Sequence, residues 1–279
     1  MPISGAKDPC GDLYLDLLKK CLAFSLWPQT LYMPFDLALE HPPKEVAEFA
    51  EGLRRIGYCL TKEFPYRPEI PEEGAAIPYL AHTMIGLRRL DNFQFCIEQV
   101  IADEVPGDII ETGVWRGGAC ILARGVLKAH GIKNRKIWLA DSFQGLPPPN
   151  VEKYPIDKGD DHYLNPFLRV KVEEVKNHFR CFGLLDDQVC FLEGWFKDTL
   201  PHAPIECLSV LRLDGDLYES TMDALQALYD KLSLQGYIII DDYDGMGCRQ
   251  AVTDFRKATG IDDPILPIDS HGVYWRRGQ

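Results

Sequence analysis

The sequence predicts an α/β fold in which a mostly parallel sheet is covered by helices on both faces. From residue 107 onward, short apolar runs alternate with helix-forming stretches, the pattern of a parallel sheet. Acidic residues follow several of these runs, at the edge where such sheets hold ligands. We expect the last two strands to form an antiparallel hairpin at one edge. The seven predicted strands are 108–112, 136–141, 188–193, 207–214, 236–241, 264–269 and 272–276.

The segment before the sheet is expected to be partly helical. Apolar residues recur at helical spacing over 12–26, so we predict an amphipathic helix that packs on the main body or on a second subunit. Several prolines interrupt residues 27–78, where only 45–56 has a helical pattern. A further helix is predicted over 83–104, leading into the first strand.

We therefore divide the chain into two parts. Residues 1–78 form a helical N-terminal extension on the oligomer and acceptor side, and residues 79–279 form the α/β domain. The amphipathic helix makes a homo-oligomer, a dimer or a tetramer, the expected state. The chain length of 279 residues is sufficient for one large α/β domain with such an extension.

Composition limits the partners and the compartment. A formal charge of −12 argues against nucleic acid and against an anionic membrane surface, because both attract basic proteins. The nine cysteines are scattered and include no C-x-x-C pair, so neither a zinc cluster nor a disulfide framework is indicated. No run reaches transmembrane length and no secretory signal is recognised, so we expect a cytoplasmic protein.

Two acidic clusters end neighbouring predicted strands. Asp214 follows the strand that ends in Leu213, and Asp241 and Asp242 follow Ile240. Parallel strands bring these carboxylates to one edge, where their repulsion favours a bound divalent cation, and oxygen ligands suit Mg²⁺. Helix capping would explain one cluster. Two clusters together with a glycine-rich motif upstream favour a site.

The upstream motif joins the first predicted strand to a helix. Ile110 is followed by Glu111 and by a turn with glycines at 113, 117 and 118, which permit close approach of a ligand to the backbone. The spacing is neither that of a dinucleotide fingerprint nor that of a P-loop. Because an acidic residue would repel a pyrophosphate, the motif suits a ligand with a cationic amino-acid part, such as S-adenosylmethionine.

Asp141 ends the second predicted strand. In doubly wound folds an acidic residue at this place binds ribose hydroxyls. The alternative is a turn or capping residue ahead of Ser142 and Phe143. We favour the nucleoside role because the position is the one that the fold uses.

Residues 144–170 interrupt the alternation. The segment contains three consecutive prolines and several acidic residues, which favour a surface loop. Such a loop would lie above the carboxyl edge, where it acts either as a lid that orders with substrate or as a disordered excursion. His162 within it is interpreted as a solvated loop residue.

The motifs together resemble the macrocin O-methyltransferase family, whose members methylate sugar hydroxyls of macrolide and aminocoumarin antibiotics. The resemblance covers residues 80–276, and the N-terminal Leu13–Lys20 is similar to the mycinamicin-type branch. The motifs that carry it are Ala81–Gly86, Arg89–Asn92, Glu111–Gly118, Asp141–Pro147, Gly183–Val189, Gly194–Pro201, Leu213–Thr221 and Ile240–Tyr243.

The resemblance implies a class I S-adenosylmethionine-dependent methyltransferase fold and a Mg²⁺-dependent O-methyl transfer. It implies that Asp214, Asp241 and Asp242 bind the metal. Space-filling or core packing is the alternative role for Met84, Trp115 and Trp195. The residues that it implies for the cofactor are Thr83, Met84, Glu111, Thr112, Gly113, Trp115, Asp141, Ser142, Phe143, Gly194 and Trp195.

The resemblance does not directly identify the residue that accepts the proton of the hydroxyl. Related catechol-type enzymes place a lysine three residues after the first metal aspartate, and here that position is Leu217. Our hypothesis is therefore that Asp214 itself accepts the proton, with Glu219 as the second choice. We assign no chemistry to Arg88, Arg89 or Arg116.

Three functions remain open. The first is methylation of a sugar hydroxyl on a glycosylated secondary metabolite, a small-molecule acceptor. The second is the same chemistry on a catechol-like or polyketide hydroxyl. The third is a nucleoside-binding protein without activity, against which the complete set of three aspartates argues.

Overall fold

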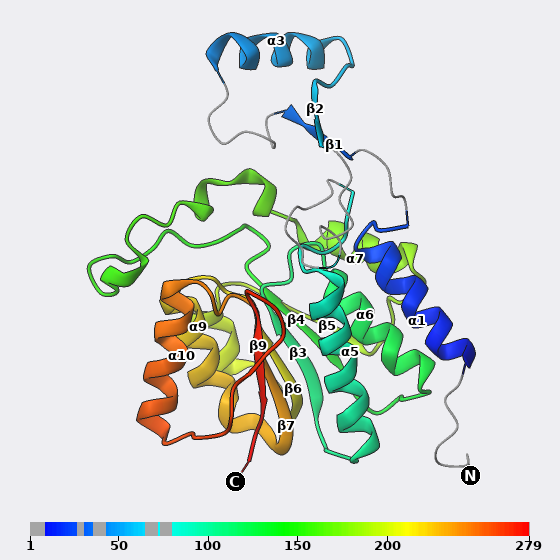
Figure 1. Ribbon diagram of the computed structural model, residues 1–279, viewed down its shortest axis with the longest axis vertical. Helices are drawn as coiled ribbons and strands as arrows, with labels where there is room; N and C mark the ends of the chain where they lie inside the picture. The colour runs from blue at the N-terminus through cyan, green and yellow to red at the C-terminus, as the bar shows by residue number, and fades with distance from the viewer. Residues whose placement is uncertain (1–8, 27–30, 36–42, 65–71, 73–79, 279) are drawn as a thin grey trace.

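The structure is a computed structural model that describes residues 9–26, 31–35, 43–64, 72 and 80–278. A seven-stranded sheet runs through its centre in the order β5-β4-β3-β6-β7-β9-β8 (Figure 1). The first five strands in this order are parallel, β9 is antiparallel to β7, and β8 pairs antiparallel with β9. The fold class and the edge hairpin are therefore confirmed. The strands are β3 Asp108–Thr112, β4 Ile137–Asp141, β5 Val189–Glu193, β6 Leu208–Leu213, β7 Leu232–Ile240, β8 Leu266–Pro267 and β9 Val273–Arg276.

Helices cover the two faces of the sheet and form two separate apolar cores (Figure 1). Helices α1 Pro9–Leu22, α5 Leu87–Ala102, α6 Gly118–Ala129 and α7 Val172–Cys181 lie on one face. Helices α8 Phe196–Thr199, α9 Tyr218–Leu228 and α10 Met246–Thr259 lie on the other. The described residues also form five 3₁₀ turns: η1 Pro155–Asp157, η2 His162–Leu164, η3 Pro166–Leu168, η4 Leu200–His202 and η5 Tyr229–Lys231.

The N-terminal helix packs on the main body. Leu15, Leu18 and Leu22 of α1 are buried against α6. A Cβ on Gly125 of α6 would lie 2.5 Å from Leu18 Cδ2, so the glycine lets the two helices approach closely. The body-packing role that the sequence predicts for this helix is confirmed.

The rest of the N-terminal extension is described in pieces. Strands β1 Leu31–Pro34 and β2 Thr61–Phe64 pair antiparallel, and α3 Lys44–Arg55 lies between them in the chain. In Figure 1 these elements stand apart from the sheet, above it. The helix predicted over 45–56 is confirmed, and the pair of strands was not predicted. Parts of the extension lie outside the described residues: 1–8, 27–30, 36–42, 65–71 and 73–79.

Several predicted boundaries are wrong. Strand β7 begins at Leu232 rather than at residue 236, and helix α1 spans Pro9–Leu22 rather than 12–26. Helix α5 begins at Leu87 rather than at residue 83, because the residues up to the extended Gly86 form a turn held by its own contacts. Strand β8 has two residues rather than the six of 264–269, because Pro264 and Pro267 lack the amide protons that a longer ladder needs. Within the described residues, no helix combines the length and the apolar character that crossing a bilayer requires.

The strand order places a site between β3 and β6. The chain runs outward from β3 to β5 on one side and from β6 to β7 on the other, so the order reverses between β3 and β6. Ligands of open α/β sheets bind in the crevice beyond the strand ends at such a switch point. The Asp214 amide donates to Thr112 O at 2.9 Å, which fixes the ends of the two strands side by side.

Candidate functional site

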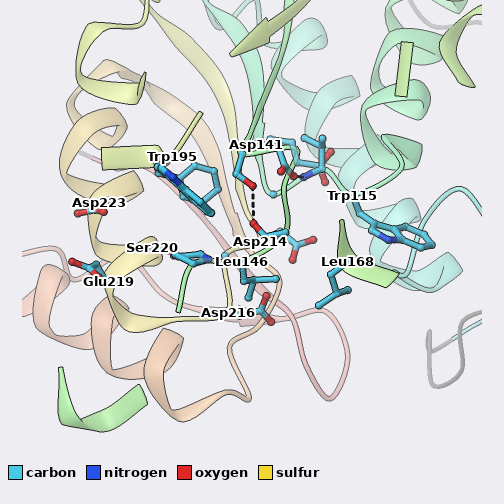
Figure 2. Close-up of a pocket in the computed structure, with 18 of the residues that line it drawn as sticks. Trp115, Asp141, Leu146, Leu168, Trp195, Asp214, Asp216, Glu219, Ser220 and Asp223 are labelled. Carbon is cyan, nitrogen blue, oxygen red and sulfur yellow. Dashed lines mark hydrogen bonds between the residues drawn. The ribbon is translucent and has the colours of Figure 1, made fainter. Parts of the chain in front are cut away.

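A cavity of about 430 Å³ opens at the switch point, a volume typical of a small-molecule site. Figure 2 shows Trp195 and Trp115 on opposite sides of it, with Asp141 and Asp214 between them. The cavity brings together most of the residues predicted for the cofactor and one of those predicted for the metal. The predicted residues that line it are Thr83, Met84, Glu111, Gly113, Trp115, Asp141, Ser142, Trp195 and Asp214.

Three predicted cofactor residues, Thr112, Phe143 and Gly194, are not among the lining residues. Thr112 is fully buried, and its carbonyl accepts the Asp214 amide. The Phe143 ring is buried with its centroid 6.2 Å from that of Phe191. The side chains of Thr112 and Phe143 therefore do not line the cavity, and the cofactor roles of these three positions stay predictions.

The segment before α5 supplies Thr83 and Met84. It is fixed by the Gly118 amide of α6, which donates to His82 O at 2.9 Å. A Cβ on Gly118 would lie 2.4 Å from that oxygen, so only glycine allows this approach. The segment is a turn, not the first part of a helix, and this shape directs its side chains into the cavity.

Gly113 forms the turn after β3. Its φ of +82° lies in the left-handed region, and a Cβ there would lie 1.7 Å from Asp214 O. The donor loop predicted from the glycine-rich motif and the first predicted metal ligand are therefore in backbone contact. Any side chain at 113 would separate them.

Asp141 is held by the loop that follows β3. Its Oδ2 accepts the Val114 amide at 2.8 Å, and its Oδ1 accepts the Phe143 amide at 2.7 Å. Burial raises the pKa of this carboxyl, and the amide donors oppose that rise. Each carboxylate oxygen keeps a second lone pair, so these bonds leave Asp141 able to accept from a ligand hydroxyl.

The three predicted metal ligands converge. Asp214, Asp241 and Asp242 each offer an oxygen, and these oxygens lie within 4.8 Å of one another. Burial and then the surrounding negative charges hold the pKa of Asp214 and of Asp242 well above the usual range. An all-oxygen donor set under mutual repulsion fits a hard divalent cation such as Mg²⁺.

Two buried arginines hold this cluster. The Arg212 guanidinium donates to Glu111, to Asp214 Oδ2 at 2.9 Å and to Asp241. Arg89 Nη1 donates to Asp241 Oδ2 at 2.6 Å, and its Nε lies 3.0 Å from Asp269 Oδ2. Carboxylates that bind metals are commonly held by such partners. Although the sequence analysis assigned no chemistry to Arg89, it orients a predicted metal ligand.

Asp216 is a site residue that the sequence analysis missed. It lines the cavity beside Asp214 (Figure 2), and its backbone has a φ of +55°, which is strained for a residue with a side chain. Its amide donates to Asp242 Oδ2 at 3.0 Å. Burial raises the pKa of its carboxyl to about 6, while the nearby His162 opposes the rise. The sequence signal was present, because Asp216 stands two residues after Asp214 in the same acidic run.

The segment 144–170 lies over the site. It supplies Leu146, Pro147 and Leu168 to the cavity wall. Two bonds anchor it: Trp115 Nε1 donates to Phe167 O at 2.9 Å, and the Tyr218 amide of α9 donates to Asp157 Oδ1 at 2.9 Å. The segment lies where the sequence predicts a lid, and its closing over substrate stays a prediction.

Comparison with known proteins identifies the family. The macrocin-O-methyltransferase (TylF) family matches residues 11–277. The chain is 46% identical over 279 residues to demethyldecarbamoylnovobiocin O-methyltransferase of Streptomyces niveus, covering 99% of this chain and 98% of that one. It is 51% identical over 269 residues to mycinamicin III 3''-O-methyltransferase of Micromonospora griseorubida, covering 95% and 96%.

A third relative and a solved structure agree. The chain is 56% identical over 200 residues to 8-demethyl-8-(2,3-dimethoxy-alpha-L-rhamnosyl)-tetracenomycin-C 4'-O-methyltransferase of Streptomyces olivaceus, covering 71% of this chain and 77% of that one. The structure of the O-methyltransferase NovP superposes with a TM-score of 0.82 at 46% identity, covering 96% of this chain and all of NovP. The chain therefore belongs to the macrocin-O-methyltransferase (TylF) family and is an S-adenosylmethionine-dependent O-methyltransferase.

Proposed function

We propose that the protein transfers a methyl group from S-adenosylmethionine to a sugar hydroxyl of a glycosylated secondary metabolite, with Mg²⁺ bound at the three aspartates. The observation that carries the proposal is the convergence of Asp214, Asp241 and Asp242 at the edge of the donor cavity. The names of the relatives support the acceptor class, because they include an enzyme that methylates a rhamnosyl group and others that act on novobiocin and mycinamicin precursors. We infer that the acceptor is a glycosylated antibiotic of the macrolide or aminocoumarin type.

When bound, S-adenosylmethionine supplies an electrophilic methyl group, and Mg²⁺ supplies a Lewis acid that polarises a hydroxyl. The residues around the cavity position the reactants. Thr83 and Met84 would close over the amino-acid end of the donor, and Glu111 would offer negative charge to its ammonium group. Asp141 and Ser142 would hold the ribose, and Trp195 would border the adenine. Direct transfer requires this alignment because oxygen, carbon and sulfur must lie in line.

The acceptor hydroxyl must lose its proton. Asp214 is the general base that the sequence predicts, and Asp216 is a second candidate for the base that lines the same cavity. Asp214 already accepts from Arg212 and belongs to the metal cluster, which weakens it as a base. Among the described residues Asp216 has no such arginine partner, and it is not one of the three predicted metal ligands, so its carboxylate is left to accept a proton. This comparison favours Asp216.

The N-terminal extension is proposed to serve acceptor binding and assembly. Leu13 and Leu17 of α1 are exposed on the side that does not pack on α6. Exposed apolar residues on a helix are a common feature of subunit interfaces. A homo-oligomer would cover them.

Calorimetric titration and a chelation assay test the function. We expect S-adenosylmethionine to bind the protein, and turnover on a glycosylated antibiotic precursor to stop when metal is chelated and to return with Mg²⁺. Turnover that survives thorough chelation would refute the metal role. Turnover on a catechol but on no glycosylated acceptor would favour the alternative function, methylation of a catechol-like or polyketide hydroxyl.

Two variants separate the proton acceptors. Asp216→Asn should bind donor and Mg²⁺ normally and lose turnover, whereas Asp214→Asn should lose Mg²⁺ affinity as well. An Asp214→Asn variant with normal donor binding and full turnover would remove Asp214 from the mechanism. Full turnover by Asp216→Asn would remove Asp216.

A further inference from the structure

One buried cation touches both halves of the site. The Arg212 side chain is 1% exposed and lies in β6, between the donor cavity and the carboxylate cluster. Its Nη1 donates to Glu111 Oε1 and to Asp214 Oδ2, and its Nη2 donates to Asp241 Oδ1. Although burial opposes its charge, the three carboxylates raise the pKa of the guanidinium further above its usual value. Arg212 is therefore fully ionised.

The three partners of Arg212 serve different ligands. Glu111 lines the donor cavity, and its second oxygen, Oε2, lies 2.8 Å from the buried Cys120 Sγ. Asp241 is not among the residues that line that cavity, and with Asp214 it belongs to the predicted metal cluster. A planar guanidinium offers donors in a fixed fork, so it can span carboxylates that a lysine ammonium would reach only one at a time.

We propose that Arg212 is a positioning residue that sets the donor-binding carboxylate and the metal-binding carboxylates at once, and so links the two sites through one side chain. The proposal rests on the proposed function of the site. It extends that function by assigning to Arg212 a role in donor affinity as well as in metal affinity. Because the link is built from protein atoms, it holds before either ligand binds.

Arg89 provides the matched control. It is also buried, at 8% exposure, and also donates to Asp241. Among the described residues the structure pairs Arg89 with Asp241 and Asp269, and not with Glu111. Loss of Arg89 should therefore disturb the metal cluster and leave the donor carboxylate in place.

The experiment compares Arg212→Lys with Arg89→Lys by calorimetry on the full chain. In protein freed of metal, Arg212→Lys should weaken S-adenosylmethionine binding by about tenfold, the scale of one lost charge-assisted hydrogen bond. Arg89→Lys leaves all three carboxylate partners of Arg212 present and should weaken that affinity far less than Arg212→Lys does. Titration with Mg²⁺ alone should show a loss of about tenfold or more in both variants, as for other residues that hold metal ligands.

The decisive measurement is whether the two variants differ in S-adenosylmethionine affinity while both lose Mg²⁺ affinity. A purely structural role would weaken both ligands equally in both variants, because each loses a buried guanidinium. Equal donor affinity in the wild type and in Arg212→Lys would overturn the proposal while leaving the proposed function standing. A wild type that binds no S-adenosylmethionine would overturn the proposed function and this inference with it.

A second variant covers the case in which Arg212→Lys does not fold. Asp241→Asn removes one anionic partner of Arg212 from a position outside the donor cavity. If the guanidinium links the sites, this change should weaken S-adenosylmethionine binding severalfold in metal-free protein. Donor affinity that is unchanged in Asp241→Asn would refute the link.

Discussion

Substitution of Gly113 by alanine tests the contact on which the site depends. A Cβ at this position would lie 1.7 Å from Asp214 O. Real Cβ atoms keep at least 3.0 Å from such neighbours, so the two backbones must separate by at least 1.3 Å. The neighbour is backbone and cannot rotate away. The change must therefore move the end of β6, and Asp214 with it, relative to the donor loop.

Two contributions lower the free energy of unfolding in Gly113→Ala. A left-handed φ of +82° costs alanine about 1 kcal/mol relative to glycine. Forcing the strand ends apart adds about 1–3 kcal/mol, the usual range for overpacking. We expect a total loss of about 2–4 kcal/mol in the free energy of unfolding. Because a displacement of about 1 Å can cost a factor of about 100 in rate, turnover should fall at least that far.

Gly131→Ala is the matched control. Gly131 has a φ of +66°, also in the left-handed region, and a Cβ there meets nothing within 4 Å. Its substitution should cost only the backbone term of about 1 kcal/mol and leave turnover unchanged. Thermal unfolding, donor calorimetry and turnover of the two variants provide the comparison. If Gly113→Ala matched Gly131→Ala in all three measurements, the argument from the close approach would be wrong.

Three further predictions concern the segment 144–170, the segment before α5 and the base. Asp157→Ala removes the acceptor of the Tyr218 amide. The variant should lose about 1 kcal/mol in the free energy of unfolding, and amide hydrogen exchange over 144–170 should become faster. Unchanged exchange would show that this hydrogen bond does not anchor the segment. Burial, then the nearby His178, lowers the pKa of His82 to about 4 from 6.5. As the pH falls, the unfolded chain binds a proton at His82 before the folded chain does, so the free energy of unfolding should be full above pH 6.5 and decrease towards pH 4. After discounting for partial exposure, the decrease should be about 1–2 kcal/mol. His82→Phe should flatten this part of the stability profile, and an unchanged profile would show that His82 is not the titrating group. If Asp216 is the base, its pKa of about 6 requires turnover to fall as the pH drops through 6, and a flat rate between pH 5 and pH 7, measured at about half-unit steps, would exclude it.

The sheet and the position of the site were predictable because both depend on local patterns. Short apolar runs that end in acidic residues mark buried parallel strands, and the topology then brings their ends together. Asp214 and the Asp241–Asp242 pair were expected to meet for this reason, and the structure places their oxygens within 4.8 Å. The antiparallel edge followed from the turn residues 269–272.

The arginines were not predictable, because nothing local marks them. Arg212 stands in an apolar run of β6, where a lone charged residue normally points to solvent or ends the strand. It is tolerated there only because carboxylates from three separate places in the chain surround it. Arg89 likewise reaches Asp241, which is 152 residues further along the chain. Such partners are determined by tertiary packing, which periodicity does not report.

The same physics explains why three of the positions predicted for the cofactor do not line the cavity. A motif identifies a turn, but the side chains within a turn point in different directions, and only some of them meet the ligand. Phe143 has a φ of +55°, which turns its ring into the core while Asp141 and Ser142 line the cavity. Of the six non-glycine residues with a positive φ in the described part of the chain, three follow the ends of parallel strands at the site: Trp115, Phe143 and Asp216. The strained turns direct carboxylates from separate strands towards one centre. The residues that sequence patterns do not identify are therefore the ones that give the site its geometry.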